Sequence, residues 1–441
     1  MGNWRPAVVA RGGESALRFA PIDVGRWLTW GLTALLFFAL PFVFKTGFAI
    51  TLLSQMGILI VFALSYNMLL GQAGMLSFGH AVYAGLGAFF AIHALNWIGA
   101  GKIWLPVSLL PLVGGAFGAL FGVIFGYVTT KKTGTPFAMI TLGIGEMVFA
   151  SSLMFPDFFG GEGGITTNRV VGEAFLGITY GPGRQVYFLI AVWCLLSMVA
   201  MYAFSHTPLG RISNAVRENP ERVEFVGYNT QMVRFLVLIV SAFFAGISGA
   251  LSAINFEIVS AENVSAVRSG GVLFATFIGG ALFFFGPILG AVIFIFFAVA
   301  LSDFTKAWQL YLGAFFVLMV MFAPGGVASL VLMNLRVMKY GLFYRLRDPY
   351  VGVLLSGAVL LTGVVMMVEM SYHLTLEIGS GTMMRLFGFR IDAASPEAWV
   401  MAIGTLAGGA LAFEAMRRRF SRAWGAVQER IEEQIARDLR V

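Results

Sequence analysis

A chain of 441 residues would ordinarily hold two or three soluble domains, but its composition excludes that class. Hydrophobic residues make up 59% of the chain, charged residues make up 12%, and the mean hydropathy is +0.85. The net charge of +7 does not point to nucleic acid, because most basic residues lie between apolar runs. Since a soluble domain is roughly 45–50% apolar and about 25% charged, the sequence indicates an all-α polytopic protein embedded in a lipid bilayer.

Apolar runs long enough to cross a bilayer recur along the chain. A hydrocarbon core of roughly 30 Å needs about 20 apolar residues in a helix. We therefore expect about twelve transmembrane helices. They cover approximately 27 to 44, 48 to 70, 74 to 95, 105 to 129, 136 to 155, 185 to 204, 231 to 256, 270 to 285, 287 to 302, 308 to 323, 350 to 369 and 396 to 416. The two runs between 270 and 302 are short enough to be half-spans.

The distribution of Lys and Arg predicts the orientation, because loops rich in these residues stay cytoplasmic. With the N-terminus inside, 21 of the 29 basic residues fall on the cytoplasmic side. Both termini are therefore expected in the cytoplasm. The first apolar run is too long for a removed signal peptide and lacks a small-residue cleavage site.

Two segments are expected outside the membrane. The Gly-rich stretch 156 to 184, which holds Asp157, Glu162 and Glu173, is expected to be an external loop. The tail 417 to 441 has apolar residues at spacings near four and a basic start, which predicts an amphipathic helix. That helix either lies on the inner membrane surface or docks on a partner. Its apolar positions are Trp424, Val427, Ile431, Ile435 and Leu439.

Glycines at every fourth position predict close helix packing. A stripe of this kind lets a neighbouring backbone approach one helix face. Gly404 and Gly408 repeat the spacing once. We interpret both stripes as structural. The longer stripe comprises Gly114, Gly118, Gly122 and Gly126.

Residues 67 to 80 interrupt an apolar stretch with polar and Gly-rich sequence. Irregular backbone at membrane depth is tolerated only where protein or a water-filled cavity covers it. The interruption is thus either a lining of a transport pathway or a tight turn between two helices. A second interruption at 279 to 290 favours the first interpretation, since paired breaks are typical of transport sites.

Glu146 lies in the middle of a predicted span, where an unpaired carboxylate would cost several kcal/mol. It should therefore face protein or water, either as a functional group or as a helix-to-helix hydrogen-bond acceptor. His80 and His93 are the other ionisable candidates. The predicted pathway residues are Asn67, Gln72, Ser77, His80, Thr141 and Glu146.

The segment 205 to 229 combines charge with apolar residues. Asn219 before Pro220 is a helix-start signal, and Gly227 is a natural helix stop, so two short helices should meet at a corner. Their apolar side could dock on a soluble partner, or the segment could be only a connector. That side would comprise Ile212, Ala215, Val216, Val223, Phe225 and Val226.

The absence of certain motifs bears on the energy source. No GxxxxGK[ST] sequence occurs, so the chain cannot bind ATP through a P-loop of its own. The sequence holds no pattern typical of a metal site or a catalytic nucleophile, so we expect no catalytic residue and no metal or other cofactor bound directly. An ion-driven secondary transporter would need coupling charges at the midplane, where Glu146 is nearly alone.

Three stretches together resemble the membrane-spanning permease subunits of branched-chain amino acid ABC importers, the LivM type. These are NMLLGQAGMLSFGHAVYAGLG at 67 to 87, the pair TLGIGE at 141 to 146 with GGEGGI at 160 to 165, and GRISNAVRENPERVEFVGYN at 210 to 229. The region after 246 and the FAPGGV at 322 to 327 are also similar to that family. The resemblance covers about residues 48 to 330.

The resemblance implies a type II ABC importer permease fold in a bacterial inner membrane. A permease domain at 27 to 330 would follow a cytoplasmic segment at 1 to 26. Its partners would be a second, different permease, two cytoplasmic ATPases that hold ATP and magnesium, and a periplasmic solute-binding protein. The 205 to 229 loop would rest on an ATPase through Arg211, Asn214, Ala215, Arg217, Glu218, Asn219, Pro220, Glu221, Gly227 and Tyr228.

Two features leave the assignment open. The family pattern ends near 330, whereas residues 331 to 441 add two apolar runs whose role does not follow from the resemblance. The expected cargo is a branched-chain or other hydrophobic amino acid, but systems for urea, amides and aromatic acids share these motifs. An ion-coupled secondary transporter and a membrane-embedded enzyme are the alternatives from other classes.

Overall fold

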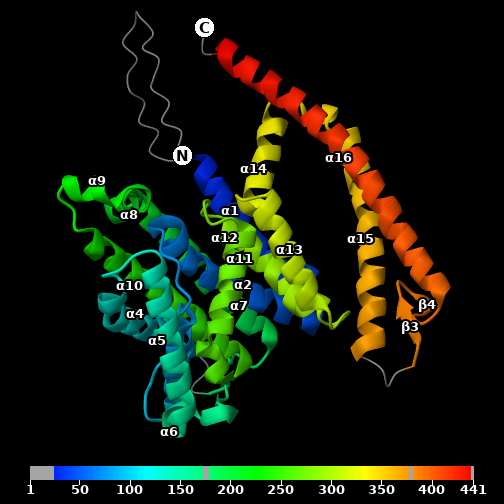
Figure 1. Cartoon of the computed structure of the whole chain (residues 1–441). Helices are drawn as coiled ribbons and strands as arrows, with labels where there is room; N and C mark the ends of the chain where they lie inside the picture. Colours follow the sequence, from blue (N-terminus) through cyan, green and yellow to red (C-terminus); the bar gives the residue numbers. More distant parts are fainter. Residues whose placement is uncertain (1–23, 172–177, 377–380, 439–441) are drawn as a thin grey trace, which may run out of the picture. The chain divides into compact units, whose positions relative to one another are not determined.

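The computed structural model describes residues 24–171, 178–376 and 381–438, in two units, Met1–Lys45 and Thr46–Val441 (Figure 1). In the first unit, α1 (Val24–Val43) is mainly apolar in sequence. Its leucines Leu28, Leu32, Leu35 and Leu36 are exposed, as suits a helix that faces lipid.

The first part of the second unit is a bundle of long apolar helices. Between α7 and α10 lie two short helices, and two short strands pair outside the bundle. The elements are α2 (Gly47–Asn67), the π-helical turn η1 (Met68–Gln72), α3 (Ala81–Gly99), η2 (Val107–Leu109), α4 (Leu110–Thr129), α5 (Thr135–Met154), α6 (Pro156–Phe159), η3 (Gly161–Gly163), β1 (Ile165–Thr166), α7 (Gly183–His206), α8 (Pro208–Glu218), α9 (Pro220–Phe225), α10 (Thr230–Phe256) and β2 (Ile258–Val259).

The core of the bundle lies where α10 meets α3 and α4. A Cβ placed on Gly246 of α10 would lie 2.1 Å from the carbonyl oxygen of Gly114. A Cβ on Gly118 would lie 2.4 Å from the Ala242 carbonyl oxygen. Because only glycine permits these approaches, the stripe from Gly114 to Gly126 builds the helix contact, as the sequence predicts.

The segment 156 to 184 carries short elements of its own. Strand β1 pairs antiparallel with β2, with Ile165 opposite Val259. Arg169 donates hydrogen bonds to the carbonyl oxygens of Tyr180 and Asn255, at 2.8 and 3.1 Å. These bonds tie the loop to the end of α10. The expected residue Glu173 lies outside the described residues.

A second group of helices follows and is interrupted twice. Its elements are η4 (Ala261–Val264), α11 (Ala266–Gly279), α12 (Gly286–Ile295), η5 (Phe296–Leu301), α13 (Trp308–Phe322) and α14 (Gly326–Lys339). Residues 280–285 separate α11 from α12, and α13 meets α14 at a bend of 53°. Helix α14 was not among the expected apolar runs.

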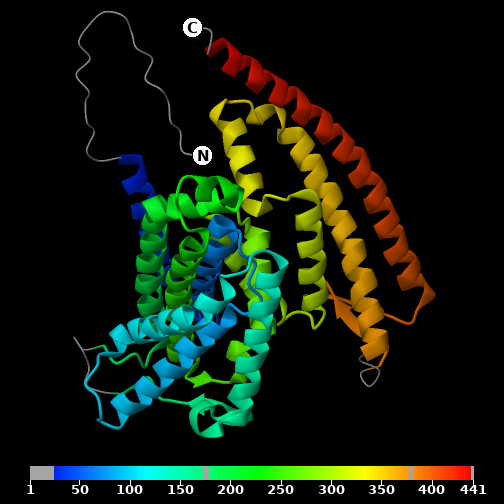
Figure 2. The same cartoon turned by 60° about the vertical axis from the view of Figure 1, so that its left-hand side comes forward.

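The C-terminal part is a long helical hairpin, in which α15 and α16 lie side by side (Figures 1 and 2). The tail residues Val427 and Ile431 are buried against Val337, Leu342 and Leu346. The tail is therefore a continuation of the last span, with its apolar side packed on the chain itself. The elements are η6 (Phe343–Arg345), α15 (Arg347–Leu376), β3 (Met383–Leu386), β4 (Phe389–Asp392) and α16 (Pro396–Asp438).

The prediction for the second glycine pair was wrong. A Cβ on Gly404 or Gly408 would meet no atom within 4 Å. The close contact between α15 and α16 is made instead by Gly409, where a Cβ would lie 2.6 Å from the Leu360 nitrogen. Because an α-helix has 3.6 residues per turn, Gly409 faces α15, whereas Gly404 and Gly408 do not.

Every expected apolar run overlaps a helix, but not all are full spans. Among the described residues, eight helices are long and apolar enough to cross a membrane, or nine with the bent pair α13 and α14. The apolar helices Leu28–Val43, Ala266–Gly279 and Gly286–Leu301 are shorter. The span predicted from 74 begins only at Ala81, because residues 74–80 are not helical.

Candidate functional site

The α8–α9 corner, residues 207–229, is fixed by side-chain caps. The Thr207 hydroxyl accepts a hydrogen bond from the Gly210 backbone N–H at 3.2 Å. The Asn219 side-chain oxygen accepts one from the Arg222 N–H at 3.0 Å. Each cap is followed by proline at the first helical position, which favours a helix start. The two helices predicted from the sequence are present.

The apolar residues of the α8–α9 corner divide into two sets. Val216 and Val223 are 2% and 7% exposed and pack with Val233 of α10, with Ile212 beside them. The expectation that Ile212, Val216 and Val223 face a partner was wrong, because these side chains lie on the helix faces that pack on the bundle. The outward apolar side chains are Phe225, Val226 and Tyr228, which are 91%, 71% and 48% exposed.

The other predicted residues of the corner lie mainly on its surface. Asn214 and Arg217 are half-buried, and the backbone at Gly227 has a φ of 94°, which favours glycine. The exposed ones are Arg211, Ala215, Glu218, Asn219, Pro220 and Glu221. The corner therefore presents charged groups of both signs around the apolar tip.

Arg217 turns inward. Its Nη1 atom donates to the carbonyl oxygen of Gly71 in η1. A Cβ on Gly74 would lie 2.8 Å from the Cγ of Arg217. The side chain therefore joins the α8–α9 corner to the end of the α2 helix.

Residues 73–80, the connecting segment, run back from η1 to α3 in contact with three helices. The Tyr66 hydroxyl of α2 donates to the Ser77 carbonyl oxygen at 3.0 Å. The Phe78 N–H donates to Thr141 Oγ1 of α5 at 3.2 Å. Just after the segment, the Ala81 N–H donates to Ser269 Oγ of α11 at 3.0 Å. The segment is therefore held by side chains rather than by regular backbone pairing.

Five of the six predicted pathway residues are buried. His80 Nε2 lies 3.0 Å from Ser65 Oγ. The structure brings Ser77, His80 and Thr141 together around the connecting segment, with Asn67 and Gln72 in the helical stretch before it. The residues that are at most 8% exposed are Asn67, Gln72, Ser77, His80 and Thr141.

The same region concentrates unpaired polar atoms. Seven buried side-chain nitrogen or oxygen atoms of the described residues make no hydrogen bond, and four belong to residues 67–80. Leaving a buried polar group without a hydrogen bond costs about 1–3 kcal/mol, so each of these atoms calls for an explanation. The four atoms are Asn67 Oδ1, Gln72 Oε1, Ser77 Oγ and His80 Nδ1.

Three interruptions of helices meet in one place. A Cβ on Gly71 would lie 2.2 Å from the carbonyl oxygen of Ala281, in the break between α11 and α12. A Cβ on Gly280 would lie 2.2 Å from the carbonyl oxygen of Gly325, between α13 and α14. The two breaks singled out in the sequence are therefore neighbours, and a third adjoins them.

Helix α5 has one buried and one exposed face. Thr141 and Gly145 lie on the buried side, next to Gly79 of the connecting segment. Glu146 is exposed and has no partner among the described residues, and Met147 beside it is 52% exposed. A carboxylate in the middle of a span requires water or protein around it. Glu146 therefore needs water or protein beside it, although the exposed side chains of Met139 and Met147 on the same helix are apolar.

A family comparison decides the identity of the chain. Residues 48–324 match the family described as the permease component of branched-chain amino acid transport systems. The chain belongs to this family. The matched part of the permease contains the α8–α9 corner, the connecting segment and α5.

The permease is similar to named permeases for two kinds of cargo. It is 29% identical to the high-affinity branched-chain amino acid permease protein LivM of Salmonella typhimurium over 319 residues, covering 67% of this chain and 74% of that protein. LivM of Escherichia coli is 28% identical over the same coverage. The galactose and methyl galactoside import permease MglC of Salmonella typhimurium is 27% identical over 55% of this chain and 75% of its own. No solved structure matches.

The permease is therefore a multi-pass membrane protein whose relatives are transport subunits. Within the described part of the chain, no three His, Cys, Asp or Glu side chains lie close enough to hold a metal ion.

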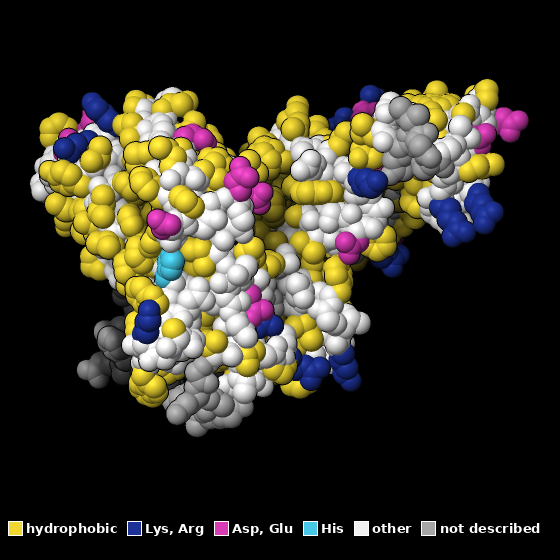
Figure 3. All heavy atoms as spheres, turned by 90° about the horizontal axis from the view of Figure 1, so that it is seen from below, with side chains coloured by type: hydrophobic (Ala, Val, Ile, Leu, Met, Phe, Trp, Pro, Cys, Tyr) yellow, Lys and Arg dark blue, Asp and Glu magenta, His cyan; other side chains and the backbone are white. Residues whose placement is uncertain are grey.

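The end on which α6 lies carries charged side chains of both signs, scattered among apolar ones (Figure 3).

The permease contains one membrane carboxylate that the sequence analysis missed. Glu369 of α15 accepts hydrogen bonds from Thr305 Oγ1 at 2.6 Å and from the Tyr311 hydroxyl at 2.9 Å. It joins the C-terminal hairpin to α13 and the turn before it. Glu369 is the last residue of the run 350 to 369, and a charge at the end of an apolar run does not stand out from the loop that follows a span.

Proposed function

We propose that this chain is the pathway-forming permease of an ATP-driven importer for branched-chain or other hydrophobic amino acids. It would accept cargo from a periplasmic solute-binding protein and release it into the cytoplasm. A second, different permease and two cytoplasmic ABC ATPases, which bind ATP and magnesium, would complete the complex. Family membership and the similarity to two LivM proteins support this proposal.

The observation that carries the proposal is a continuous set of contacts from the α8–α9 corner to α5. The first contact joins Arg217 to the carbonyl oxygen of Gly71. The connecting segment follows, and its Phe78 N–H bonds to Thr141 on α5. Because packed interfaces transmit displacement rather than absorb it, closure of the ATPases against the corner would shift the helix that faces the pathway.

The exposed face of α5 would line the cargo pathway against the second permease. Glu146 would then lie in water or against that subunit, which removes the cost of a carboxylate in lipid. Tight binding of cargo in both states of the pathway would not drive transport, because a ligand with equal affinity for two states shifts no equilibrium. We therefore expect the walls of the pathway to bind cargo weakly.

The orientation follows from the basic loops. The α8–α9 corner and both termini would face the cytoplasm of a bacterial cell, and the segment 156 to 184 would face the periplasm. In this arrangement the exposed Phe225, Val226 and Tyr228 meet an ATPase.

Uptake by the reconstituted complex tests the proposal. Vesicles that contain all subunits should accumulate leucine only when ATP is enclosed with the ATPases. Truncating an aromatic anchor at the centre of an interface costs about 2 kcal/mol or more. The double variant Phe225→Ala, Tyr228→Ala should therefore lose most of its import and release the ATPases during purification.

Phe389→Ala is the matched control, since Phe389 is 73% exposed but lies on β4 of the C-terminal hairpin. Full import by the double variant would refute the role of the corner. Accumulation driven by a proton gradient without any ATPase would establish an ion-coupled transporter instead. A ligand screen of the binding protein separates amino acids from urea, amides and aromatic acids.

A further inference from the structure

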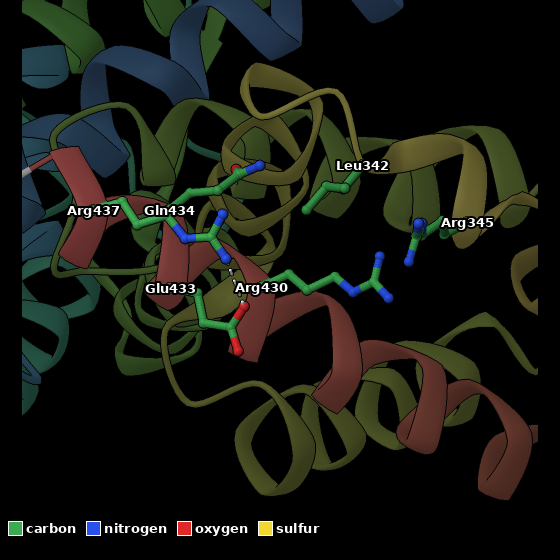
Figure 4. Close-up of a pocket in the computed structure, with 6 residues that line it drawn as sticks. All are labelled: Leu342, Arg345, Arg430, Glu433, Gln434 and Arg437. Atoms are coloured by element: carbon green, nitrogen blue, oxygen red, sulfur yellow. Dashed lines mark ion pairs between the residues drawn. The ribbon is translucent and has the colours of Figure 1, made fainter.

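A groove lies between η6 and the end of α16, and Figure 4 shows the residues that line it. Its volume is about 410 Å³. Four of the six lining residues come from α16 and two from the segment between α14 and α15. They are Leu342, Arg345, Arg430, Glu433, Gln434 and Arg437.

The groove carries more positive than negative charge. Glu433 pairs with Arg437, whose Nη2 lies 3.8 Å from Oε2 of the carboxylate. Arg345 donates to the hydroxyl of its neighbour Tyr344 at 2.9 Å. Among the described residues, no carboxylate pairs with Arg345 or Arg430. Two guanidinium charges are therefore uncompensated in one groove.

These two guanidinium groups are turned toward each other across the groove (Figure 4). Like charges that converge in this way repel, and an anion between them converts the repulsion into attraction. Arginine presents a planar fork of N–H donors that matches the oxygens of a phosphate. The geometry therefore suits a phosphate-sized anion.

The groove adjoins an apolar cluster. Leu342 lines the groove and belongs to a buried cluster with Val337, Leu346, Val427 and Ile431. On the outside, large apolar side chains remain exposed. They are Leu335, Met338, Phe343 and Tyr344, at 52%, 56%, 39% and 66%.

An aromatic cluster marks the depth of the groove in the bilayer. The rings of Tyr350 and Phe420 lie 4.8 Å apart, and those of Phe420 and Trp424 lie 5.7 Å apart. Tyr and Trp gather at the level of the lipid headgroups. Arg430 follows Trp424 by six residues, or about 9 Å along the helix. Both arginines lie outside the apolar runs 350 to 369 and 396 to 416, Arg345 by five residues and Arg430 by fourteen.

We propose that this groove binds the phosphate group of an anionic glycerophospholipid. Arg345 and Arg430 hold the phosphate from opposite sides, while the acyl chains lie along the exposed apolar residues of α14 and η6. Basic pockets between helices at the membrane surface recognise lipids of this class. A bound lipid would hold the tail of α16 against α14. A soluble acidic partner would not need the apolar surface beside the arginines.

Native mass spectrometry of the purified full chain tests the proposal with synthetic phosphatidylglycerol and phosphatidylcholine as probes. We expect the wild type to retain phosphatidylglycerol several-fold more than phosphatidylcholine. The double variant Arg345→Gln, Arg430→Gln should lower retention of phosphatidylglycerol about tenfold, as expected for the loss of one charge-assisted hydrogen bond or more.

The control is the double variant Arg419→Gln, Arg422→Gln, which also removes two positive charges but takes both from α16, outside the groove. It should retain the lipid like the wild type. The variant Arg345→Lys, Arg430→Lys keeps the charge and should retain an intermediate amount. It also provides the test if the glutamine variant does not fold.

Four results would overturn the proposal. Equal retention of the two lipids would show no preference for a net negative headgroup. Equal losses in the groove variant and its control would show a general effect of charge. If glycerol 3-phosphate at millimolar concentration bound as well as the lipid, the groove would be assigned to a soluble anion. If the groove variant lost an ATPase subunit from the assembled complex while lipid retention stayed unchanged, the groove would be assigned to a protein.

Discussion

Arg217 lies in the most charged loop of the chain, yet its side chain serves the interior. The guanidinium donates to the Gly71 carbonyl oxygen and covers Gly74. A carbonyl at the end of a helix lacks an intrahelical partner, so a charged donor is well suited to it. At the scale of single residues, this contact is the point at which the corner meets the interrupted helix.

The variant Arg217→Gln should keep the assembled complex but lower import at least about tenfold. The reason is the loss of a charge-assisted hydrogen bond worth about 1.5–3 kcal/mol. Leucine uptake and co-purification of the ATPases are the measurements. Arg390→Gln, on the exposed strand β4, is the control and should import normally. Unchanged import by Arg217→Gln would remove this contact from the coupling route.

Glu369→Leu should destabilise the protein. The change leaves the half-buried hydroxyls of Thr305 and Tyr311 without their acceptor, and the cost should stay below the roughly 1–3 kcal/mol of a fully buried unpaired group. Thermal unfolding in detergent measures the effect. Glu414→Leu is the control, because Glu414 pairs only with Arg417 and Arg418 on its own helix. Equal shifts in the two variants would contradict a role for Glu369 in joining α15 to α13.

At the scale of elements, the contact of α10 with α4 depends on the absence of side chains. Carbonyl oxygens of α10 approach Gly114 and Gly118, and side chains of α10 approach Gly122 and Gly126, so the two helices interlock closely. The contact also supports the site, since α10 packs on α3, which follows the connecting segment.

Gly246→Ala should lower the folded yield. Its Cβ would lie 2.1 Å from the Gly114 carbonyl oxygen, and overpacking costs about 1–3 kcal/mol. Size-exclusion profiles of a fluorescent fusion, with thermal unfolding, measure this. Gly404→Ala is the matched control, because no atom lies within 4 Å of its Cβ. If the control lost as much folded protein, the cause would be the general replacement of glycine in a helix.

At the scale of the whole molecule, the family match and the C-terminal hairpin occupy different parts of the chain. The match ends at residue 324, whereas α15 and α16 begin at Arg347 and Pro396. The hairpin has an apolar cluster of its own, centred on Met370 and Ala402. The contacts from Arg217 to Thr141 lie entirely before it.

A chain that ends at residue 346 should therefore still import amino acids. Its thermal stability should fall, because removal of the hairpin exposes Val337 and Leu342 and deletes the acceptor of Thr305 and Tyr311. Leucine uptake and thermal unfolding of the reconstituted complex are the measurements. Loss of import in a complex that assembles normally would show that the hairpin takes part in transport.

The sequence by itself determined the membrane class, the approximate positions of most long helices and the two-helix corner. These features are local. Apolar runs of bilayer length specify helices, and Asn219 with Pro220 specifies a helix start within a few residues. The family also followed from the sequence, because its motifs are continuous stretches of chain.

Only the tertiary structure decided which groups meet. Gly71 lies 210 residues before Ala281 and 146 before Arg217 in the chain, yet it contacts both. The same packing turned Val216 inward, left Phe225 exposed and placed the tail of α16 on α14. Helix periodicity predicts that a face is apolar, but not whether lipid, a partner or the chain itself covers it. That choice depends on contacts between residues far apart in sequence, because close packing selects the neighbour.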